Sequence, residues 1–381
     1  EMSEGELATR DSSQYLSSYR RVLEYFDAVK IGLTATPAKH TSEIFGKPVY
    51  TYSYREAVAD DWLIDHEPPI RYETLLSQNG ISFEKGSEVE FINRHTGVIE
   101  SAELDDEMNF DIESFNRQVI NEKFNRVICE ELVKELDPFS EEKTLIFCAP
   151  ARDNLHADMI KRLLDESFQA MYGDEYKQAA VAKITGQSDK VDRLISEFKN
   201  ETYPNIAITV DLLTTGIDVL KICNLVFLRR VKSRILYEQM VGRATRRCDE
   251  IGKTVFRIYD PVDIYAALEA VNTMKPLVKD PKVTLAQLVG ELIDPETLEM
   301  ALTKPGEGQD KTHADVILSQ ISQKVMKVLR KAKKKAEQKP ELKQKLDQLE
   351  QQWEVEPDKL HQHLRAMGPQ QAATFVREQT A

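Results

Sequence analysis

The spacing of apolar residues divides the chain into two parts that meet near residue 280. From residue 144 to residue 259, short apolar runs alternate with stretches in which apolar residues recur every three or four positions. The runs predict buried strands and the stretches predict amphipathic helices. We expect strands at 144–148, 180–184, 205–210, 225–228 and 254–259, with helices at 156–166, 190–198 and 233–246. Strands that alternate with helices indicate βαβ units, so the predicted fold class is α/β with a mostly parallel sheet and flanking helices.

After residue 280 only the helical spacing remains, which predicts an all-α domain after the sheet. The expected helices cover 283–293, 295–303, 314–335, 341–353 and 357–365, and a last one starts at 369. Their apolar faces suit packing against one another or against a partner protein, and the sequence leaves both possibilities open.

The residues before the sheet give a mixed pattern. A helical pattern at 13–28 runs into a short apolar run at 29–37, an αβ unit whose sheet partners are not found in the chain. A strand at 49–54 and a short helix at 55–63 are expected next. The acidic stretch from residue 83 to residue 142 predicts a solvated hairpin and then a helix over 112–136. Its negative charge would repel phosphates, which disfavours a DNA-facing role for this stretch.

Composition narrows the class of protein. Hydrophobic residues make up 41% of the 381 residues, which is enough for packed cores and excludes global disorder. The net charge of −13 predicts that any nucleic acid is bound in a local groove and not over the whole surface. No apolar run is long enough to span a membrane and no secretory signal pattern is present, so we expect no membrane contact. The four cysteines form no Cys-x-x-Cys pair, which predicts no metal site and fits a reducing, cytoplasmic location.

Three polar clusters stand at the ends of expected strands or on the adjoining helix. The third covers residues 239–247 and reads Gln-Met-Val-Gly-Arg-Ala-Thr-Arg-Arg. On a helix, Arg243 and Arg246 would share one face, and two guanidinium groups aimed at one point neutralise a transferring phosphoryl group. Gly242 permits close backbone approach, and Gln239 on the same face would hold an attacking water or an arginine. The plainer interpretation is the basic end of a surface helix.

The other two clusters carry hydroxyl groups. The second follows the third expected strand and contains Thr214, Thr215, Gly216 and Asp218. Backbone N–H groups at such a turn suit a phosphate, and a carboxylate suits a ribose hydroxyl. The plainer interpretation is an ordinary turn in which the carboxylate caps a helix. The first cluster, with Thr34 and Thr36, is uninformative by itself.

Together, and in this order, the clusters resemble the signature of superfamily 2 helicases. Thr34-Ala35-Thr36 resembles motif III, residues 145–148 with Arg152 resemble motif IV, residues 211–219 resemble motif V, and Gln239-x-x-Gly-Arg-x-x-Arg resembles motif VI. Within that superfamily the chain is most similar to the restriction (R) subunit of type I restriction–modification enzymes, a family of DNA-translocating motors. The narrower resemblance is carried by residues 31–37, 54–64, 214–219 and 242–247 and by the helical tail.

The resemblance implies roles for single residues. Arg243 and Arg246 would be catalytic arginine fingers that complete an ATP site between two RecA-like domains, with Gln239 beside them. Contacts to the nucleotide are implied for Gly216, Asp218 and Gly242. Contacts to double-stranded DNA are implied for residues at strand ends, some of which would also couple the two domains: Thr34, Thr36, Arg152, Thr185, Gly186, Thr214 and Thr215. ATP and Mg²⁺ would be the cofactors of the full-length protein.

The resemblance also implies a domain organisation. Residues 1–40 would be a C-terminal remnant of the first RecA-like domain, and residues 41–140 a connector with the acidic hairpin. Residues 141–275 would form the second RecA-like domain. Residues 276–381 would form a truncated helical domain that docks on the modification (methyltransferase) and specificity subunits.

One departure from the family pattern limits the expected activity. The chain has no Gly-x-x-x-x-Gly-Lys-Ser/Thr and no Asp-Glu-x-His. We therefore expect a fragment of a larger ATP-dependent deoxyribonuclease that has no ATPase activity by itself, because phosphate positioning and magnesium binding are both missing. Two alternatives stay open, a superfamily 2 DNA repair helicase and a non-enzymatic RecA-like adaptor that binds DNA or a partner.

Overall fold

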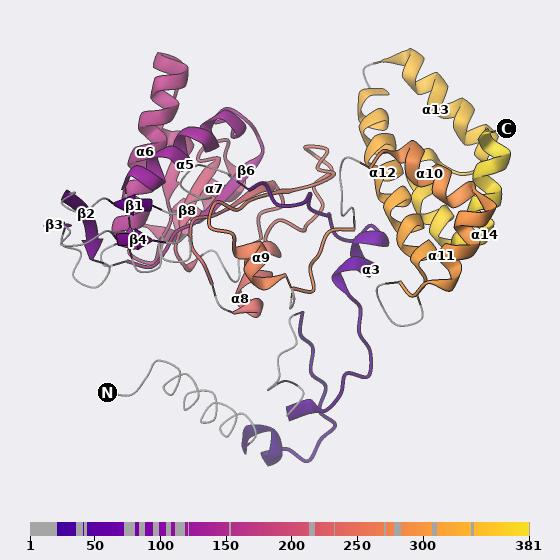
Figure 1. Ribbon diagram of the computed structural model, residues 1–381, viewed down its shortest axis with the longest axis horizontal. Helices are drawn as coiled ribbons and strands as arrows, with labels where there is room; N and C mark the ends of the chain where they lie inside the picture. Colours follow the sequence, from indigo (N-terminus) through magenta and orange to yellow (C-terminus); the bar gives the residue numbers. More distant parts are fainter. Residues whose placement is uncertain are drawn as a thin grey trace.

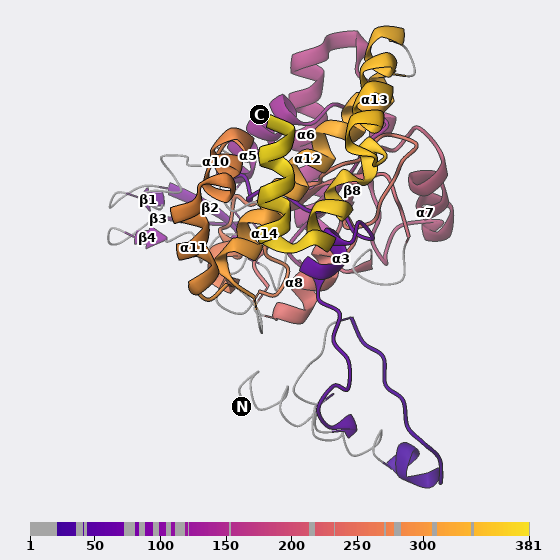
Figure 2. The ribbon, with the colours of Figure 1, turned by 90° about the vertical axis from the view of Figure 1, so that its right-hand side faces the viewer.

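The chain forms two lobes joined by the stretch that begins with α3 (Tyr54–Ala59) (Figure 1). The computed structural model describes residues 21–35, 41, 44–71, 81–83, 88–93, 99–103, 108–110, 119–120, 122–151, 154–212, 218–231, 233–269, 272–277, 283–306, 311–336 and 339–380. We call residues 122–277 the sheet lobe and residues 283–380 the helical lobe. The described residues between 21 and 53 form an arm that extends away from both lobes (Figures 1 and 2).

The sheet lobe is built on five parallel strands in the order β10-β9-β6-β8-β7. The strands are β6 (Lys143–Phe147), β7 (Val181–Lys183), β8 (Ile206–Thr209), β9 (Ile222–Phe227) and β10 (Arg257–Tyr259). Each is shorter than, or shifted by a few residues from, the run that predicted it, but all five exist. The α/β fold class with a parallel sheet is therefore confirmed.

Helices cover both faces of this sheet, which explains why β6, β8 and β9 are buried at every position and mostly apolar. α5 (Glu122–Glu135) and α6 (Leu155–Tyr172) lie on one face, and α7 (Val191–Asn200), α8 (Arg234–Val241) and α9 (Ile264–Leu268) lie on the other. Successive strand residues point to opposite faces. Ile146 accordingly packs with the α5–α6 side, whereas Leu145 and Phe147 pack with the other side. Full burial of each such side chain contributes roughly 1.5–3 kcal/mol.

Short antiparallel strands precede α5. β2 (Glu88–Asn93) pairs with β3 (Ile99–Glu103), with Glu88 opposite Glu103, and this pair confirms the expected hairpin. β1 (Ile81–Phe83) pairs with β4 (Met108–Phe110). The helix expected over 112–136 is wrong at 119–120, where β5 (Val119–Ile120) pairs with β2, and is confirmed over α5. Residues 112–118 of the expected helix lie outside the described residues.

The connector before the sheet lobe adds an edge to the sheet. Residues 64–70 run parallel to β10, with His66 bridging to Phe256 and Ile70 to Tyr259. The Ile70 N–H donates to the Ile258 carbonyl at 2.8 Å. Backbone pairing of this kind is invisible to side-chain periodicity, because it depends on a strand more than 180 residues away.

Two expected strands are absent from the described residues. Over 49–54 the chain has no strand, because Ser53 caps α3, whose first turn starts at Tyr54. Over the described part of 29–37 there is no strand either, and Val29, Ile31 and Leu33 are all more than 80% exposed. The backbone N–H and C=O groups of a strand need hydrogen-bond partners on a neighbouring strand. None of the described strands lies beside these residues.

The helical lobe consists of α10 (Leu285–Ile293), α11 (Pro295–Thr303), α12 (His313–Ala336), α13 (Pro340–Trp353) and α14 (Leu360–Thr380), which confirms the all-α prediction (Figure 2). α14 joins the last two expected helices, and Gly368 kinks it at a positive φ of 73° before Pro369. Leu292, Ile321 and Leu364 are among the residues that form the core between the helices. Most of the predicted apolar faces are therefore used inside the lobe.

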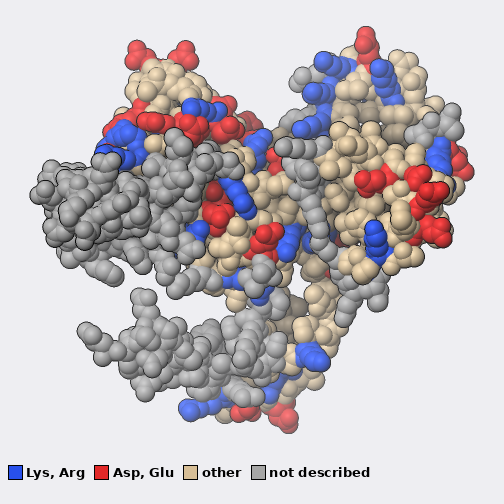
Figure 3. Space-filling view, viewed as in Figure 1, with Lys and Arg blue, Asp and Glu red and all other residues tan. Residues whose placement is uncertain are grey.

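Both acidic and basic side chains lie on each lobe on the face shown in Figure 3, and on the helical lobe basic side chains gather at the top and acidic ones on the right-hand side. None of the helices in the described part of the chain is both long enough and apolar enough to cross a membrane.

Candidate functional site

The arginines of the third cluster lie in a turn and not on a helix. α8 ends at Val241, and the Gly242 N–H donates to the Glu238 carbonyl at 2.8 Å. The next residues turn back, and the Thr245 hydroxyl donates to the Gly242 carbonyl at 3.0 Å. The expectation of a helix through Arg246 is therefore wrong. We call residues 242–247 the arginine turn.

The connector fixes this turn from outside. Leu63 forms an antiparallel bridge with Arg246, and the Ile64 N–H donates to the Thr245 carbonyl at 2.6 Å. Ala244 is buried in the core of the sheet lobe. The position of the two arginines thus depends on a segment about 180 residues earlier in the sequence.

The structure brings the second and third clusters together. Arg246 Nη1 lies 2.9 Å from Asp218 Oδ1, and both side chains are partly exposed. Burial lowers the pKa of Arg243, as does the nearby charge of Arg246, while Asp218 opposes the shift. Two guanidinium groups therefore lie within electrostatic reach of each other and of one carboxylate. Such a pair can bind an anion with several oxygens, such as a phosphate chain.

Two more predicted residues of the third cluster lie at the end of α8. Gln239 is half-buried in its last turn. Gly242 has a helical φ of −56°, so no positive φ demands glycine there. A Cβ on Gly242 would lie 3.1 Å from the Glu238 carbonyl oxygen, which is tight, so close approach is the reason that the position favours glycine.

The candidate DNA contacts are only partly described. Thr36, Arg152, Thr214 and Thr215 lie outside the described residues, as does Gly216 of the candidate nucleotide contacts. Thr34 is exposed in the arm.

Thr185 and Gly186 follow β7 at the carboxyl edge of the sheet. The Thr185 hydroxyl accepts from Asn154 Nδ2 at 3.0 Å and its side chain is buried. Gly186 is exposed, and a Cβ there would meet no atom within 4 Å. The backbone of this turn is therefore more accessible to a ligand than the threonine side chain is.

Sequence reasoning missed two charged residues that organise the site. Arg229 follows β9 and is buried. It donates to the Val210 carbonyl, and also to Asp211 Oδ1 at a distance of 2.8 Å. These two bonds connect the start of the second cluster to the strand beside it. Asp61 forms ion pairs with Arg247 and with the helical lobe. A basic residue directly after a buried strand was a usable signal for Arg229, whereas no local pattern marks Asp61.

The chain is similar to known proteins over most of its length. Residues 123–248 match the family described as helicase conserved C-terminal domain. The chain is 47% identical over 333 residues to the type I restriction enzyme EcoKI endonuclease subunit of Escherichia coli strain K12, a match that covers 86% of this chain and 28% of the relative. It is 32% identical over 265 residues to the EcoAI endonuclease subunit of Escherichia coli, covering 66% of this chain and 30% of that protein.

The chain is also similar to a solved structure. A fragment described as an HsdR subunit of a type I restriction enzyme from Vibrio vulnificus YJ016 aligns with a TM-score of 0.50 at 26% identity, covering 68% of this chain and 45% of that one. The chain spans less than a third of the length of the two Escherichia coli relatives.

Proposed function

Because this chain belongs to the family of type I restriction enzyme R subunits over the region that it spans, we propose that it carries the second RecA-like half of an ATP-dependent motor that translocates double-stranded DNA. The identity of 47% to one such subunit and the match to a helicase domain support this function. The endonuclease activity of the whole subunit, its substrates and its partners are part of the same proposal, since the chain spans 28% of that relative.

The observation that carries the proposal is the pair of arginines beyond the end of α8. Burial and the nearby charge of Arg246 lower the pKa of Arg243, and Asp218, which pairs with Arg246, is the acidic group that opposes this shift. The phosphates of ATP would offset this repulsion, so the residues fit a triphosphate. Among the described residues no group of three or more His, Cys, Asp or Glu is placed to hold a metal, and Mg²⁺ is proposed as a cofactor of the full-length subunit.

Each residue of the site has a proposed task. ATP supplies the phosphoryl group whose transfer to water drives the motor. Arg243 and Arg246 hold that group and neutralise the charge that develops on it. Gln239, four residues before Arg243, orients the attacking water or the arginine. Asp218 keeps the Arg246 guanidinium in place when no nucleotide is bound, and with Gly216 and Gly242 it contacts the nucleotide.

DNA and the other subunits are proposed to meet different surfaces. The carboxyl edge of the sheet, with Thr185 and Gly186, is the proposed DNA track. Arg152, Thr214 and Thr215, which lie outside the described residues, are proposed to contact DNA as well. Thr34 in the arm, together with Thr36, is proposed to couple the two RecA-like domains. The helical lobe is proposed to dock on the methyltransferase and specificity subunits. All four cysteines are buried free thiols, which fits the proposed cytoplasmic location.

The two alternatives have less support. A repair helicase does not account for similarity that continues beyond the helicase match at residue 248 to R subunits over 86% of the chain. An adaptor without catalysis does not account for two arginines and a carboxylate held together in a turn that the connector braces.

The test uses the full-length R subunit assembled with its partner subunits. Arg246→Ala is expected to lower the DNA-dependent kcat for ATP by about 10³-fold, because an arginine finger contributes 10³–10⁵-fold to phosphoryl transfer. Arg193→Ala is the matched control, since Arg193 pairs with Glu197 on the exposed face of α7 at 2.7 Å. Unchanged ATPase activity in the Arg246 variant would refute the arginine-finger function.

A further inference from the structure

Asp61 lies at the junction of the two lobes, just after α3. Its side chain is 8% exposed, and its φ of 70° is in the left-handed region, which few residues other than glycine adopt. Aspartate is among the residues that tolerate this conformation. The backbone thus turns sharply at a point where a carboxylate is directed into protein.

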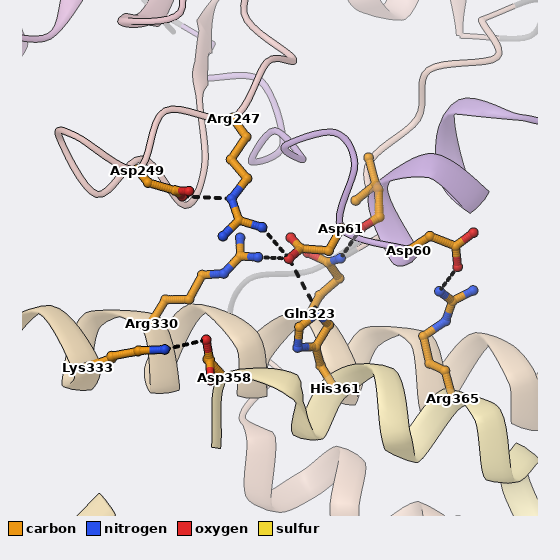
Figure 4. Close-up of polar contacts among 11 residues, drawn as sticks. Asp60, Asp61, Arg247, Asp249, Gln323, Arg330, Lys333, Asp358, His361 and Arg365 are labelled. Carbon is orange, nitrogen blue, oxygen red and sulfur yellow. Dashed lines mark hydrogen bonds and ion pairs between the residues drawn. The ribbon is translucent and has the colours of Figure 1, made fainter. Parts of the chain in front are cut away.

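The carboxylate of Asp61 contacts both lobes (Figure 4). Oδ2 accepts from Arg247 Nη1 of the arginine turn at 2.7 Å. The same oxygen accepts from Arg330 of α12, in the helical lobe. His361 of α14 lies 3.8 Å away through Nε2, and because burial lowers the pKa of His361 to about 4 it is neutral at pH 7. One oxygen atom therefore joins a cation from each lobe.

These contacts reach Arg246 from two sides. Arg247 is its covalent neighbour, and Leu63, two residues after Asp61, forms a backbone bridge with Arg246 itself. A movement of Asp61 therefore shifts both the bridge and the ion pair that border the candidate catalytic arginine.

The contacts on the helical side are extensive enough to move Asp61 with that lobe. Gln323 Nε2 of α12 donates to the Val58 carbonyl at 3.1 Å, and Arg365 of α14 pairs with Asp60 at 2.9 Å. Arg330 is only 12% exposed, so it would be left as a buried charge without Asp61. Loss of either partner of a buried ion pair is strongly unfavourable, so the two lobes are expected to keep this contact.

We propose that Asp61 is a positioning residue that couples the position of the helical lobe to that of the arginine turn. The rate of ATP hydrolysis then depends on the position of the helical lobe. The inference rests on the proposed function of Arg243 and Arg246. It adds that the lobe proposed to dock on the modification subunits controls the catalytic geometry through one carboxylate.

The experiment measures DNA-dependent ATPase activity, assembly and the thermal unfolding midpoint of the full-length R subunit in its complex. Asp61→Asn and Arg330→Met are each expected to lower kcat by about 10- to 100-fold, because small misplacements of a catalytic group cost that much. The KM for ATP is expected to stay within about twofold, because a misplaced finger acts on the transition state. Assembly is expected to be normal.

Two further variants separate positioning from folding. Asp60→Asn removes the neighbouring carboxylate, which contacts the helical lobe through Arg365, and leaves the contacts of Asp61 with Arg247 and Arg330 in place; it is expected to keep the wild-type kcat. Arg330→Lys keeps a cation opposite Asp61 and is expected to restore most of the activity lost in Arg330→Met.

The outcomes distinguish the two proposals. If Arg246→Ala abolishes turnover but Asp61→Asn or Arg330→Met keeps the wild-type kcat, transmission through Asp61 is refuted and the arginine-finger function stands. Equal impairment of Arg330→Met and Arg330→Lys would refute a charge-based contact. If Arg246→Ala itself is fully active, the proposed function fails first, independently of Asp61.

Discussion

His156 is expected to make the sheet lobe acid-sensitive. It is completely buried in the first turn of α6, where its Nδ1 accepts from the Ala149 N–H at 2.9 Å. Its Nε2 lies 3.3 Å from Asn125 Oδ1 of α5. Because Nδ1 is an acceptor, the ring is neutral with its hydrogen on Nε2. Protonation would break the bond that fastens the loop after β6 to α6.

The size of the effect follows from the pKa. Burial lowers the pKa of His156 from 6.5 to about 3. The unfolded chain therefore takes up a proton that the folded chain does not bind, so the contribution to stability is full above about pH 6.5 and is lost as the pH falls toward 3. Linkage gives a loss of about 2 kcal/mol between pH 7 and pH 5 and about 4 kcal/mol by pH 3.

Other buried groups act over the same range. Burial lowers the pKa of His361 to about 4, so the contribution of this group to stability is also lost as the pH falls. Burial raises the pKa of Asp260 to about 6, so this carboxyl contributes stability below pH 3.8 that is lost as the pH rises through 6. The pH profile of the wild type alone therefore cannot isolate His156.

The matched variant is His156→Gln, whose amide can accept and donate in the same places but does not titrate. Both proteins are unfolded with urea at pH 7 and at pH 5, and the free energy of unfolding is compared. The wild type is expected to lose about 2 kcal/mol more than the variant between the two pH values. An equal loss in both proteins would show that His156 is not held neutral by burial, and the reasoning would fail.

Three further predictions follow from buried groups and from the missing phosphate loop. Lys143→Met is expected to destabilise the chain by about 3 kcal/mol in urea unfolding. The reason is that Lys143 Nζ donates to the carbonyls of Glu201, Thr202 and Pro204 at 2.6, 3.1 and 2.8 Å. A loss of unfolding free energy below about 1 kcal/mol would contradict this prediction. The cysteines are expected to react with a thiol reagent only after unfolding, because all four are buried. Burial also raises the pKa of Cys129, Cys148 and Cys223. Fast reaction of the native chain would count against the fold. This chain by itself is expected to show no ATPase activity in a phosphate-release assay, and turnover that Arg246→Ala abolishes would disprove it.

The elements of the fold that depend on local pattern were predictable. The runs at 144–148 and 205–210 are buried on both faces, so most positions in them are apolar whatever lies beside them. The helices after residue 280 carry their own periodicity and match the structure within a few residues, apart from the kinked join at Gly368. The end of α8 was only partly predictable, because Gly242 is a poor helix former whereas Arg243, Ala244 and Arg246 are good ones. Backbone contacts of Leu63 and Ile64 with this segment hold it in a turn.

The candidate site shows the same division. The types of residue in the third cluster predicted an anion site, and a basic run after a strand could have indicated Arg229. The expected shared helix face of Arg243 and Arg246 was wrong, although the structure still places them within reach of each other's charge. The pairing of Arg246 with Asp218 joins residues 28 positions apart, and spacing alone does not contain it.

The sequence by itself determined which segments are buried, which are amphipathic and which chemistry the arginines bring, because these depend on residue type and local period. Only the tertiary structure decided the positions of those arginines. The arginine turn is bounded by the connector at Leu63, by Asp218 and by the helical lobe through Asp61. Such contacts between distant segments form only when the chain is folded, since their free energy comes from burying and pairing groups that local sequence leaves apart.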